Sequence, residues 1–371
     1  MTNRERILAI IEGRRPDRIP WIPRLQLWYN AHRITGTLPE KYRGWDLRDI
    51  ERDLGMGTPA RGAIIFSTRT ENVETKTRRR GNEIFTEYIT PVGTVSTRHV
   101  ATETLEKVGI SAYQTEHVIK RPEDYDVVEY IVEHTKLTPA YDQYIAYDKE
   151  IGEDGLPMVN LGDCPMHQIM REYLGYEKAV YEMVDHPDRI ERLLAALTDH
   201  ARERQKIALE SPAKMILHGE HFDSMMTPPP LFEEYFKPYF QEFARRLHSR
   251  GKILVCHADA DTSLLLDLIR ESGFDMAEVF TTAPMVPCTM KQARKAWGNE
   301  VIIWGGVPSV ILCDPVTDEE FEAFMLNLFE TIAPGDSFIL GVADNVMPET
   351  KFERIVRISY MVEQFKLLEK A

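Results

Sequence analysis

The second half of the chain alternates short apolar runs with longer amphipathic segments. Six apolar runs predict buried strands, at Met158–Leu161, Met215–Leu217, Ile253–Val255, Met276–Phe280, Val301–Trp304 and Ser337–Leu340. The segments around them have apolar residues at helical spacing and predict helices, at Met166–Glu172, Tyr176–Asp185, Pro187–Ser211, Pro230–Arg250, Ser263–Ser272, Met290–Trp297, Asp318–Thr331 and Lys351–Lys366. Strand, helix and strand in this order predict βαβ units and a parallel sheet.

Two further strands are predicted earlier in the chain, at Trp21–Leu25 and near Ala63–Phe66. Together with the six later ones they predict an α/β fold, a (β/α)₈ TIM barrel that forms a single domain over residues 1–371. An open doubly wound sheet is the alternative. No glycine-rich phosphate loop follows any predicted strand, so the sequence gives no support for dinucleotide binding.

Residues 63–100 have a different pattern, in which Thr, Val, Ile, Phe and Tyr dominate. Turn signals occur at Arg80-Gly81-Asn82 and at Pro91-Val92-Gly93. This pattern predicts two or three antiparallel strands, as a β-hairpin insertion near the N-terminus of the barrel. Residues 118–148 are charged and predict helices, with breaks at Pro122 and Pro139.

The composition excludes several classes of protein. The net charge of −14 argues against a nucleic-acid-binding face. No apolar run approaches the ~18 residues of a membrane span, and the first residues lack the apolar segment of a signal peptide. None of the four cysteines forms a C-x-x-C pair. We therefore expect a cytoplasmic protein with free thiols.

Polar side chains follow the predicted strands, where the carboxyl ends of barrel strands would meet. The apolar run from Gly251 ends in Cys256, His257, Asp259 and Asp261. His257 and Asp259 are two residues apart, so in an extended chain they face the same side, whereas Cys256 turns away toward the core. Other strand ends supply Glu220, Glu278, Asp344 and Asn345.

Carboxylates gathered at one mouth repel one another unless a metal ion, a proton or an arginine compensates their charge. Imidazole with carboxylates suits zinc. The predicted ligands are Glu220, His257 and Glu278, on three consecutive strands, with Asp259 and Asp344 in reserve. The alternative is that these carboxylates only cap the following helices or pair with arginines.

Arg24, Trp28 and Tyr29 follow the first predicted strand closely. They either line a substrate pocket or form a packed aromatic cluster beside a surface arginine, and the sequence favours neither.

Four segments in this order resemble the uroporphyrinogen decarboxylase superfamily, and within it the corrinoid-dependent methyltransferases. They are Asn3–Pro20, Thr227–Pro238, Gly251–Asp261 and Phe338–Pro348. The resemblance implies a (β/α)₈ barrel. Methyltransferases of this superfamily that serve coenzyme M bind zinc through His-x-Cys and a distant Cys. His257 matches that His, whereas Asp259 and Asp344 stand where the two Cys would be.

An oxygen-rich zinc site is a harder Lewis acid than a thiolate-rich one. It fits the demethylating members, the methyltransferase I components of O-demethylase systems. These take a methyl group from a small methylated substrate, such as a methoxylated aromatic, and pass it to the Co(I) corrinoid (cobalamin) of a separate protein. This chain lacks the Asp-x-His-x-x-Gly cobalamin signature, so the corrinoid protein would be a partner.

Under this interpretation His257, Asp259 and Asp344 are catalytic, while Arg24, Trp28, Tyr29 and Asn345 bind substrate. Some barrels of the superfamily are dimers, so a homodimer is one expectation. A decarboxylase of the uroporphyrinogen type is the first alternative. Its members hold a polycarboxylate with an arginine-rich N-terminal segment, whereas residues 21–29 here contain one arginine and three aromatics. A non-catalytic ligand-binding barrel is the second alternative.

Overall fold

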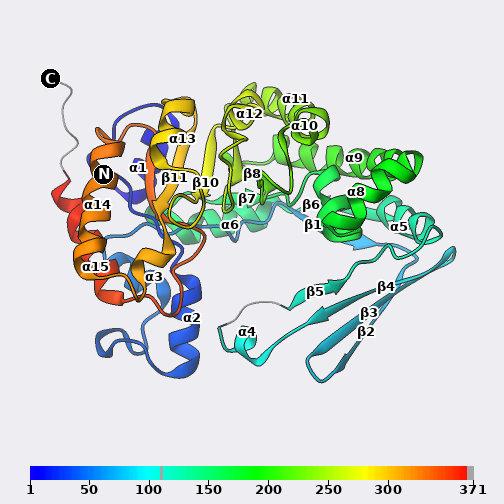
Figure 1. Cartoon of the computed structure of the whole chain (residues 1–371), viewed down its shortest axis with the longest axis horizontal. Helices are drawn as coiled ribbons and strands as arrows, with labels where there is room; N and C mark the ends of the chain where they lie inside the picture. Colours follow the sequence, from blue (N-terminus) through cyan, green and yellow to red (C-terminus); the bar gives the residue numbers. More distant parts are fainter. Residues whose placement is uncertain (109–111, 366–371) are drawn as a thin grey trace. The chain divides into compact units, whose positions relative to one another are not determined.

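The computed structural model describes residues 1–108 and 112–365 (Figure 1), without the side chains of residues 104, 105, 108 and 220. The chain groups into two compact units. The parallel-sheet unit consists of Met1–Ala63, Gln143–Asn160 and Pro212–Ala371, and the antiparallel-sheet unit of Ile64–Asp142 and Leu161–Ser211. The single domain over residues 1–371 stays a prediction.

The parallel-sheet unit contains the six predicted buried strands. They are β7 (Met158–Asn160), β8 (Met215–Glu220), β9 (Ile253–His257), β10 (Met276–Phe280), β11 (Ile302–Val307) and β12 (Phe338–Val342). The order across the sheet is β12-β11-β10-β9-β8-β7, and every neighbouring pair is parallel. The prediction of a parallel α/β sheet is therefore confirmed.

Each edge of this sheet continues by a single bridge. Trp21 bridges Leu340 of β12, and Ala63 bridges Val159 of β7, both in parallel. Neither segment is a strand of its own, so among the described residues the sheet is not a closed ring of eight strands. The predicted strand Trp21–Leu25 fails because two prolines, at positions 20 and 23, remove backbone donors from it.

One apolar core lies against alternate residues of the sheet. Met158 of β7 and Ile339 of β12 come from opposite edges of the ladder, yet both belong to this core. The sheet therefore curves around it. Ile7 and Ile10 of α1 (Asn3–Ile11) join the same core, and Thr2 begins α1 with a capping box to Glu5.

Helices follow the strands as predicted. Those of the parallel-sheet unit are α1, α2 (Gln26–Thr35), α3 (Leu47–Asp53), most of α6 (Tyr141–Ile151), α10 (Pro229–Leu231), α11 (Lys237–His248), α12 (Leu266–Glu271), α13 (Met290–Trp297), α14 (Asp318–Ile332) and α15 (Phe352–Gln364). A π-helical turn, Phe232–Phe236, joins α10 to α11. Lys366, the predicted end of the last helix, lies outside the described residues. No helix in the described ranges is both long and apolar enough to span a membrane.

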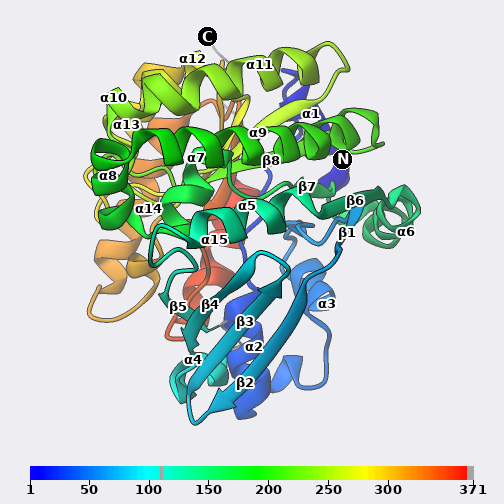
Figure 2. The same cartoon turned by 90° about the vertical axis from the view of Figure 1, so that its right-hand side faces the viewer.

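The antiparallel-sheet unit has a four-stranded sheet. Figure 2 shows this sheet from its face. Its strands, in spatial order, are β2 (Glu74–Arg80), β3 (Glu83–Thr90), β4 (Gly93–Val100) and β5 (Tyr113–Glu116). A second pair joins β1 (Phe66–Thr70) to β6 (Thr135–Pro139). The helices are α4 (Glu103–Val108), α5 (Asp124–Glu133), α7 (Pro165–Gln168), α8 (Tyr176–Asp185) and α9 (Pro187–Glu210), with a π-helical turn at Ile169–Tyr173.

The predicted hairpin insertion at residues 63–100 is not confirmed. Antiparallel strands occupy that range and turn near Gly81 and Gly93 as expected. However, the strands continue to Pro139, and the unit also includes residues 161–211. The helix predicted across Thr135–Pro139 is wrong, because those residues pair with β1.

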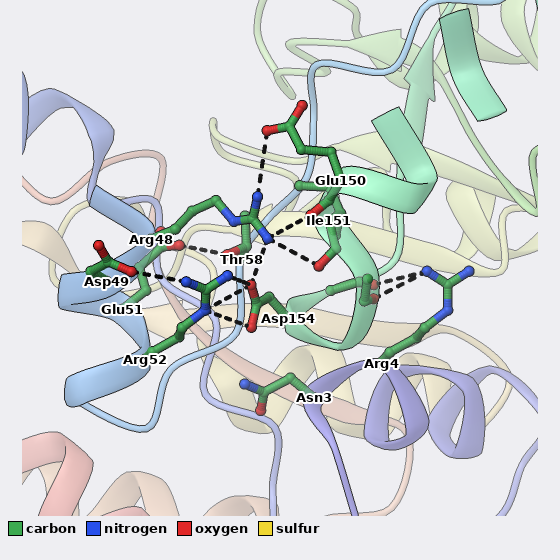
Figure 3. A network of polar contacts seen from close by, with 12 residues as sticks. Asn3, Arg4, Arg48, Asp49, Glu51, Arg52, Thr58, Glu150, Ile151 and Asp154 are labelled. Carbon is green, nitrogen blue, oxygen red and sulfur yellow. Dashed lines mark hydrogen bonds and ion pairs between the residues drawn. The ribbon is translucent and has the colours of Figure 1, made fainter. Parts of the chain in front are cut away.

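A network of arginines and carboxylates in the parallel-sheet unit holds Thr58 (Figure 3). Arg48 and Arg52 of α3 both donate to Asp154, each at 2.6 Å. The backbone N–H of Thr58 donates to the Asp154 carbonyl at 2.8 Å, and its hydroxyl donates to Glu51 Oε2 at 2.6 Å. These contacts fix the chain three residues before Arg61.

Candidate functional site

His257, the last residue of β9, lies among carboxylates from neighbouring strand ends. Its Nδ1 is 2.6 Å from Glu278 Oε2. Its Nε2 is 3.5 Å from Asp259 Oδ2 and 3.9 Å from Asp344 Oδ1. The His257 residue is only 4 % exposed, so its ring is held between an inner carboxylate and two outer ones.

Glu278 is the inner carboxylate and is completely buried in β10. Burial by itself would raise the pKa of Glu278, but the nearby Arg61 guanidinium and His257 ring hold that pKa below its usual value. Arg61 Nη1 donates to Glu278 Oε1 at 3.1 Å. Glu278 is therefore ionised, with one oxygen on Arg61 and the other on His257.

The carboxylates in turn stabilise the charged form of His257. Burial would lower the pKa of His257, but Glu278 and Asp259 raise it to about 9. Burial would raise the pKa of Asp259, whereas hydrogen bonds from His221 and His257 hold it well below its usual range. Without a metal ion, a proton on His257 balances these two anions at neutral pH.

His221 completes a compact group with His257 and Asp259. His221 Nδ1 lies 2.8 Å from Asp259 Oδ2, and the two imidazole rings meet edge to face with centroids 5.3 Å apart. One potential ligand atom from each of the three residues lies within 4.8 Å of the other two. Two imidazoles and one carboxylate are a ligand set of catalytic zinc sites.

The backbone around the group is unusual. His221, Val279 and Asp344 all have positive φ values, of 55°, 52° and 52°. Such a conformation is an outlier for a β-branched residue like Val279. Val279 lies at a bulge in β10. Gly305 of β11 is close to this bulge, because a Cβ on Gly305 would lie 2.5 Å from the backbone nitrogen of Phe280. Backbone strain of this kind clusters at functional sites.

The group of three that could hold a metal ion overlaps with the predicted set Glu220, His257 and Glu278 only at His257. Glu278 lies outside the group of three and instead fixes the Nδ1 side of His257. Glu220 ends β8 opposite His257 in the ladder, but its side chain lies outside the described part of the structure. Asp259, predicted as a reserve ligand, is in the group.

The sequence interpretation missed His221. Alternation along β8 would place His221 and Glu220 on opposite sides of the strand. The rule fails because Gly219 and His221 both have positive φ, which turns the end of the strand. A glycine just before the strand end is the one sequence signal for this departure.

Asp344 and Arg24 form the outer part of the site. Arg24 Nη1 donates to Asp344 Oδ1 at 2.7 Å, and burial lowers the pKa of Arg24. The Asp344 side chain remains 45 % exposed, in contrast to the buried Glu278. Asn345 follows it and is half-buried.

Trp28 and Tyr29 lie in a packed cluster. Trp28 is 1 % exposed and stacks on Phe352, with ring centroids 4.7 Å apart. The Tyr29 hydroxyl donates to the Trp45 carbonyl at 3.0 Å. The structure does not place either ring in the group around His257, so their contact with substrate stays a prediction.

The donor set fits zinc. The three residues supply two nitrogens and one oxygen, and catalytic zinc commonly has three protein ligands. A ligating imidazole usually donates its other N–H to a carboxylate, and Glu278 occupies that position behind His257.

Comparison with known proteins agrees with this fold. A methyltransferase from Methanosarcina mazei has a similar structure, with a TM-score of 0.56 and 14 % sequence identity over 98 % of this chain and 99 % of that chain. None of the curated proteins matches the chain. The family model described as uroporphyrinogen decarboxylase (URO-D) matches residues 107–365, which is more than half of the sequence. The predicted resemblance is confirmed: the chain belongs to the uroporphyrinogen decarboxylase family.

Proposed function

We propose that this chain is a methyltransferase that removes the methyl group from a small methylated compound, such as a methoxylated aromatic. The methyl group passes to the Co(I) corrinoid of a separate protein. The proposal is carried by the grouping of His221, His257 and Asp259, a ligand set without thiolate, in front of Glu278. The similarity to a methyltransferase structure supports it.

Zinc held by His221, His257 and Asp259 would polarise the atom that carries the methyl group and stabilise its charge as the methyl leaves. Glu278 accepts a hydrogen bond from His257 Nδ1 and so aims Nε2 toward Asp259. Arg61 keeps Glu278 ionised for this task. Since the proton on His257 must leave before Nε2 can ligate, metal binding releases that proton.

The exposure of the side chains indicates where the substrate would enter. The His221 side chain is 35 % exposed and that of Asp344 45 %, whereas His257 and Glu278 are buried. A substrate would therefore approach past His221 and Asp344. Arg24 donates a hydrogen bond to Asp344 and holds it in place, so Asp344 would orient the substrate at this opening.

The charges around the site argue against a decarboxylase for a polycarboxylate substrate. Such a substrate needs cationic partners that are not already engaged. The two arginines at the site already pair with carboxylates of the chain, Arg24 with Asp344 and Arg61 with Glu278. This favours an uncharged or weakly charged substrate.

Metal content is the first test. The purified chain should contain about one zinc per molecule, measured by inductively coupled plasma mass spectrometry. His221→Ala should lose this zinc. His248→Ala is a matched control, because His248 pairs with Asp275 elsewhere in the same unit. Zinc retained in His221→Ala would contradict the ligand assignment.

Methyl transfer is the second test. The chain is mixed with free cob(I)alamin and a panel of methoxylated aromatics, and methylcobalamin is followed by its absorbance. His257→Ala should abolish the transfer, whereas His248→Ala should not change it. Full activity in His257→Ala would refute the proposed role, and binding of a methoxylated ligand without product would favour a non-catalytic barrel.

A further inference from the structure

The antiparallel-sheet unit contains a cavity of about 380 Å³. It lies where α5 packs on β3 and β4. Val128, Ile131 and Val132 line it from α5, while Tyr88 and Thr97 line it from the sheet. The volume falls within the range of small-molecule sites and exceeds the roughly 150 Å³ of an engineered cavity that holds benzene.

Strand register explains why polar side chains line one wall. In the antiparallel pairing Tyr88 is opposite Val95, and His99 is opposite both Ile84 of β3 and Gln114 of β5. Val95, Thr97 and His99 alternate along β4, so they share the face of the sheet that carries Tyr88 and Gln114. Tyr88, Thr97, His99 and Gln114 all line the cavity from this face.

One of these polar groups is buried and has no hydrogen-bond partner among the described residues. Thr97 is 8 % exposed, and its buried hydroxyl bonds to nothing in the described part of the chain. Buried polar groups are nearly always hydrogen-bonded, so an unpaired hydroxyl beside a cavity points to a bound molecule that supplies the bond.

The lining also defines the chemistry of that molecule. Tyr88 and Tyr173 offer aromatic surfaces, and the α5 side chains are apolar. Glu172 is the one charged residue of the lining, so an anion is disfavoured. We propose that this cavity binds a small, uncharged aromatic molecule with one hydroxyl or carbonyl group, independently of the histidine site.

The naphthalene pair 2-naphthol and 2-naphthoate tests this proposal by fluorescence titration of the whole chain at neutral pH. 2-Naphthol should bind saturably, and 2-naphthoate, with its charge, at least tenfold more weakly. Thr97→Val should weaken 2-naphthol binding on the order of fivefold, since it removes one hydrogen bond. Thr94→Val is the matched control, because Thr94 is exposed on the opposite face of β4 and should leave binding unchanged.

Val128→Trp should abolish binding by filling the cavity, and His257→Ala should not affect it. The proposal is overturned if 2-naphthol does not saturate, if 2-naphthoate binds equally well, or if Thr97→Val behaves like Thr94→Val. Loss of binding in His257→Ala would place the probe in the other unit and would equally overturn it. Because Thr97→Val is nearly isosteric, the test stands even if Val128→Trp fails to fold.

Discussion

Glu51 is a buried carboxyl group that should make the stability of the parallel-sheet unit depend on pH. It lies in α3 and is 2 % exposed (Figure 3). Burial raises the pKa of Glu51 to about 8, and Asp154 adds to this effect, while the Thr58 hydroxyl and two arginines of α3 oppose it. At neutral pH the folded chain therefore keeps a proton that the unfolded chain has released.

The magnitude follows from the two pKa values. The pKa of Glu51 is about 8 when folded, against an ordinary value of 4.5. Each pH unit of difference corresponds to about 1.4 kcal/mol, so the full effect is of the order of 5 kcal/mol. Because the folded state binds the extra proton between these values, the free energy of unfolding falls as pH rises from about 4.5 to 8 and then levels off.

Glu51→Gln removes this titration and keeps the side chain neutral. The free energy of unfolding of the variant relative to the natural chain should rise by about 1.4 kcal/mol per pH unit, or roughly 3 kcal/mol between pH 5.5 and 7.5. Urea unfolding followed by tryptophan fluorescence measures it. All five tryptophans lie in the parallel-sheet unit, so the signal reports on the unit that contains Glu51.

Glu150→Gln is the matched control, because Glu150 pairs with Arg48 in the same network but is 66 % exposed. Its stability relative to the natural chain should not change with pH over this range. If the free energy of unfolding of Glu51→Gln relative to the natural chain is constant between pH 5.5 and 7.5, Glu51 is ionised in the folded chain. If the relative free energy of unfolding changes with pH equally in Glu51→Gln and Glu150→Gln, burial of Glu51 is not the cause of the pH dependence.

Two further substitutions have definite expected outcomes. Glu278→Gln should weaken zinc binding 10- to 100-fold, measured by competition with a chelator, because the ring of His257 loses its anionic partner. Gly155→Ala should lower the free energy of unfolding by about 2–3 kcal/mol, measured by tryptophan fluorescence in urea, because its Cβ would lie 2.3 Å from the Thr58 carbonyl oxygen.

The six parallel strands could be predicted from sequence because both faces of each are covered. A strand buried on both sides needs apolar residues throughout, and the run at Met276–Phe280 is found within its predicted bounds. The first predicted strand lacked this support. Its segment pairs only around Trp21, since the prolines near it cannot donate to a ladder. The extent of the antiparallel-sheet unit was also hidden, because it is built from two separate stretches of the chain.

The candidate site was predictable where the backbone is regular. His257 Nε2 lies 3.5 Å from Asp259 Oδ2. Their spacing of two residues along an extended segment predicts that the two side chains share one side. The role of Glu278 could not be read in the same way. A carboxylate near a histidine either ligates the same metal or accepts a hydrogen bond from the ring nitrogen that does not ligate. Which of the two it does depends on the nitrogen that it contacts. Here it meets Nδ1, which only the coordinates reveal.

The positive φ of His221 allows a test of backbone strain that is separate from metal binding. An alanine at φ 55° has the steric cost of the left-handed region, which glycine avoids. Contacts outside the side chain hold this conformation, since the His221 N–H donates to the His257 carbonyl at 3.2 Å. Both His221→Ala and His221→Gly lack the imidazole, so the difference between their stabilities isolates the backbone.

His221→Gly should therefore be more stable than His221→Ala by about 1 kcal/mol in urea unfolding. The same pair at Glu242, exposed within α11, should show the opposite order, with glycine about 1 kcal/mol less stable than alanine. If alanine is the more stable residue at both positions, the left-handed conformation is not imposed on residue 221 in solution. The ring of His221 would then leave Asp259, and the group of three would have to be abandoned as a metal site.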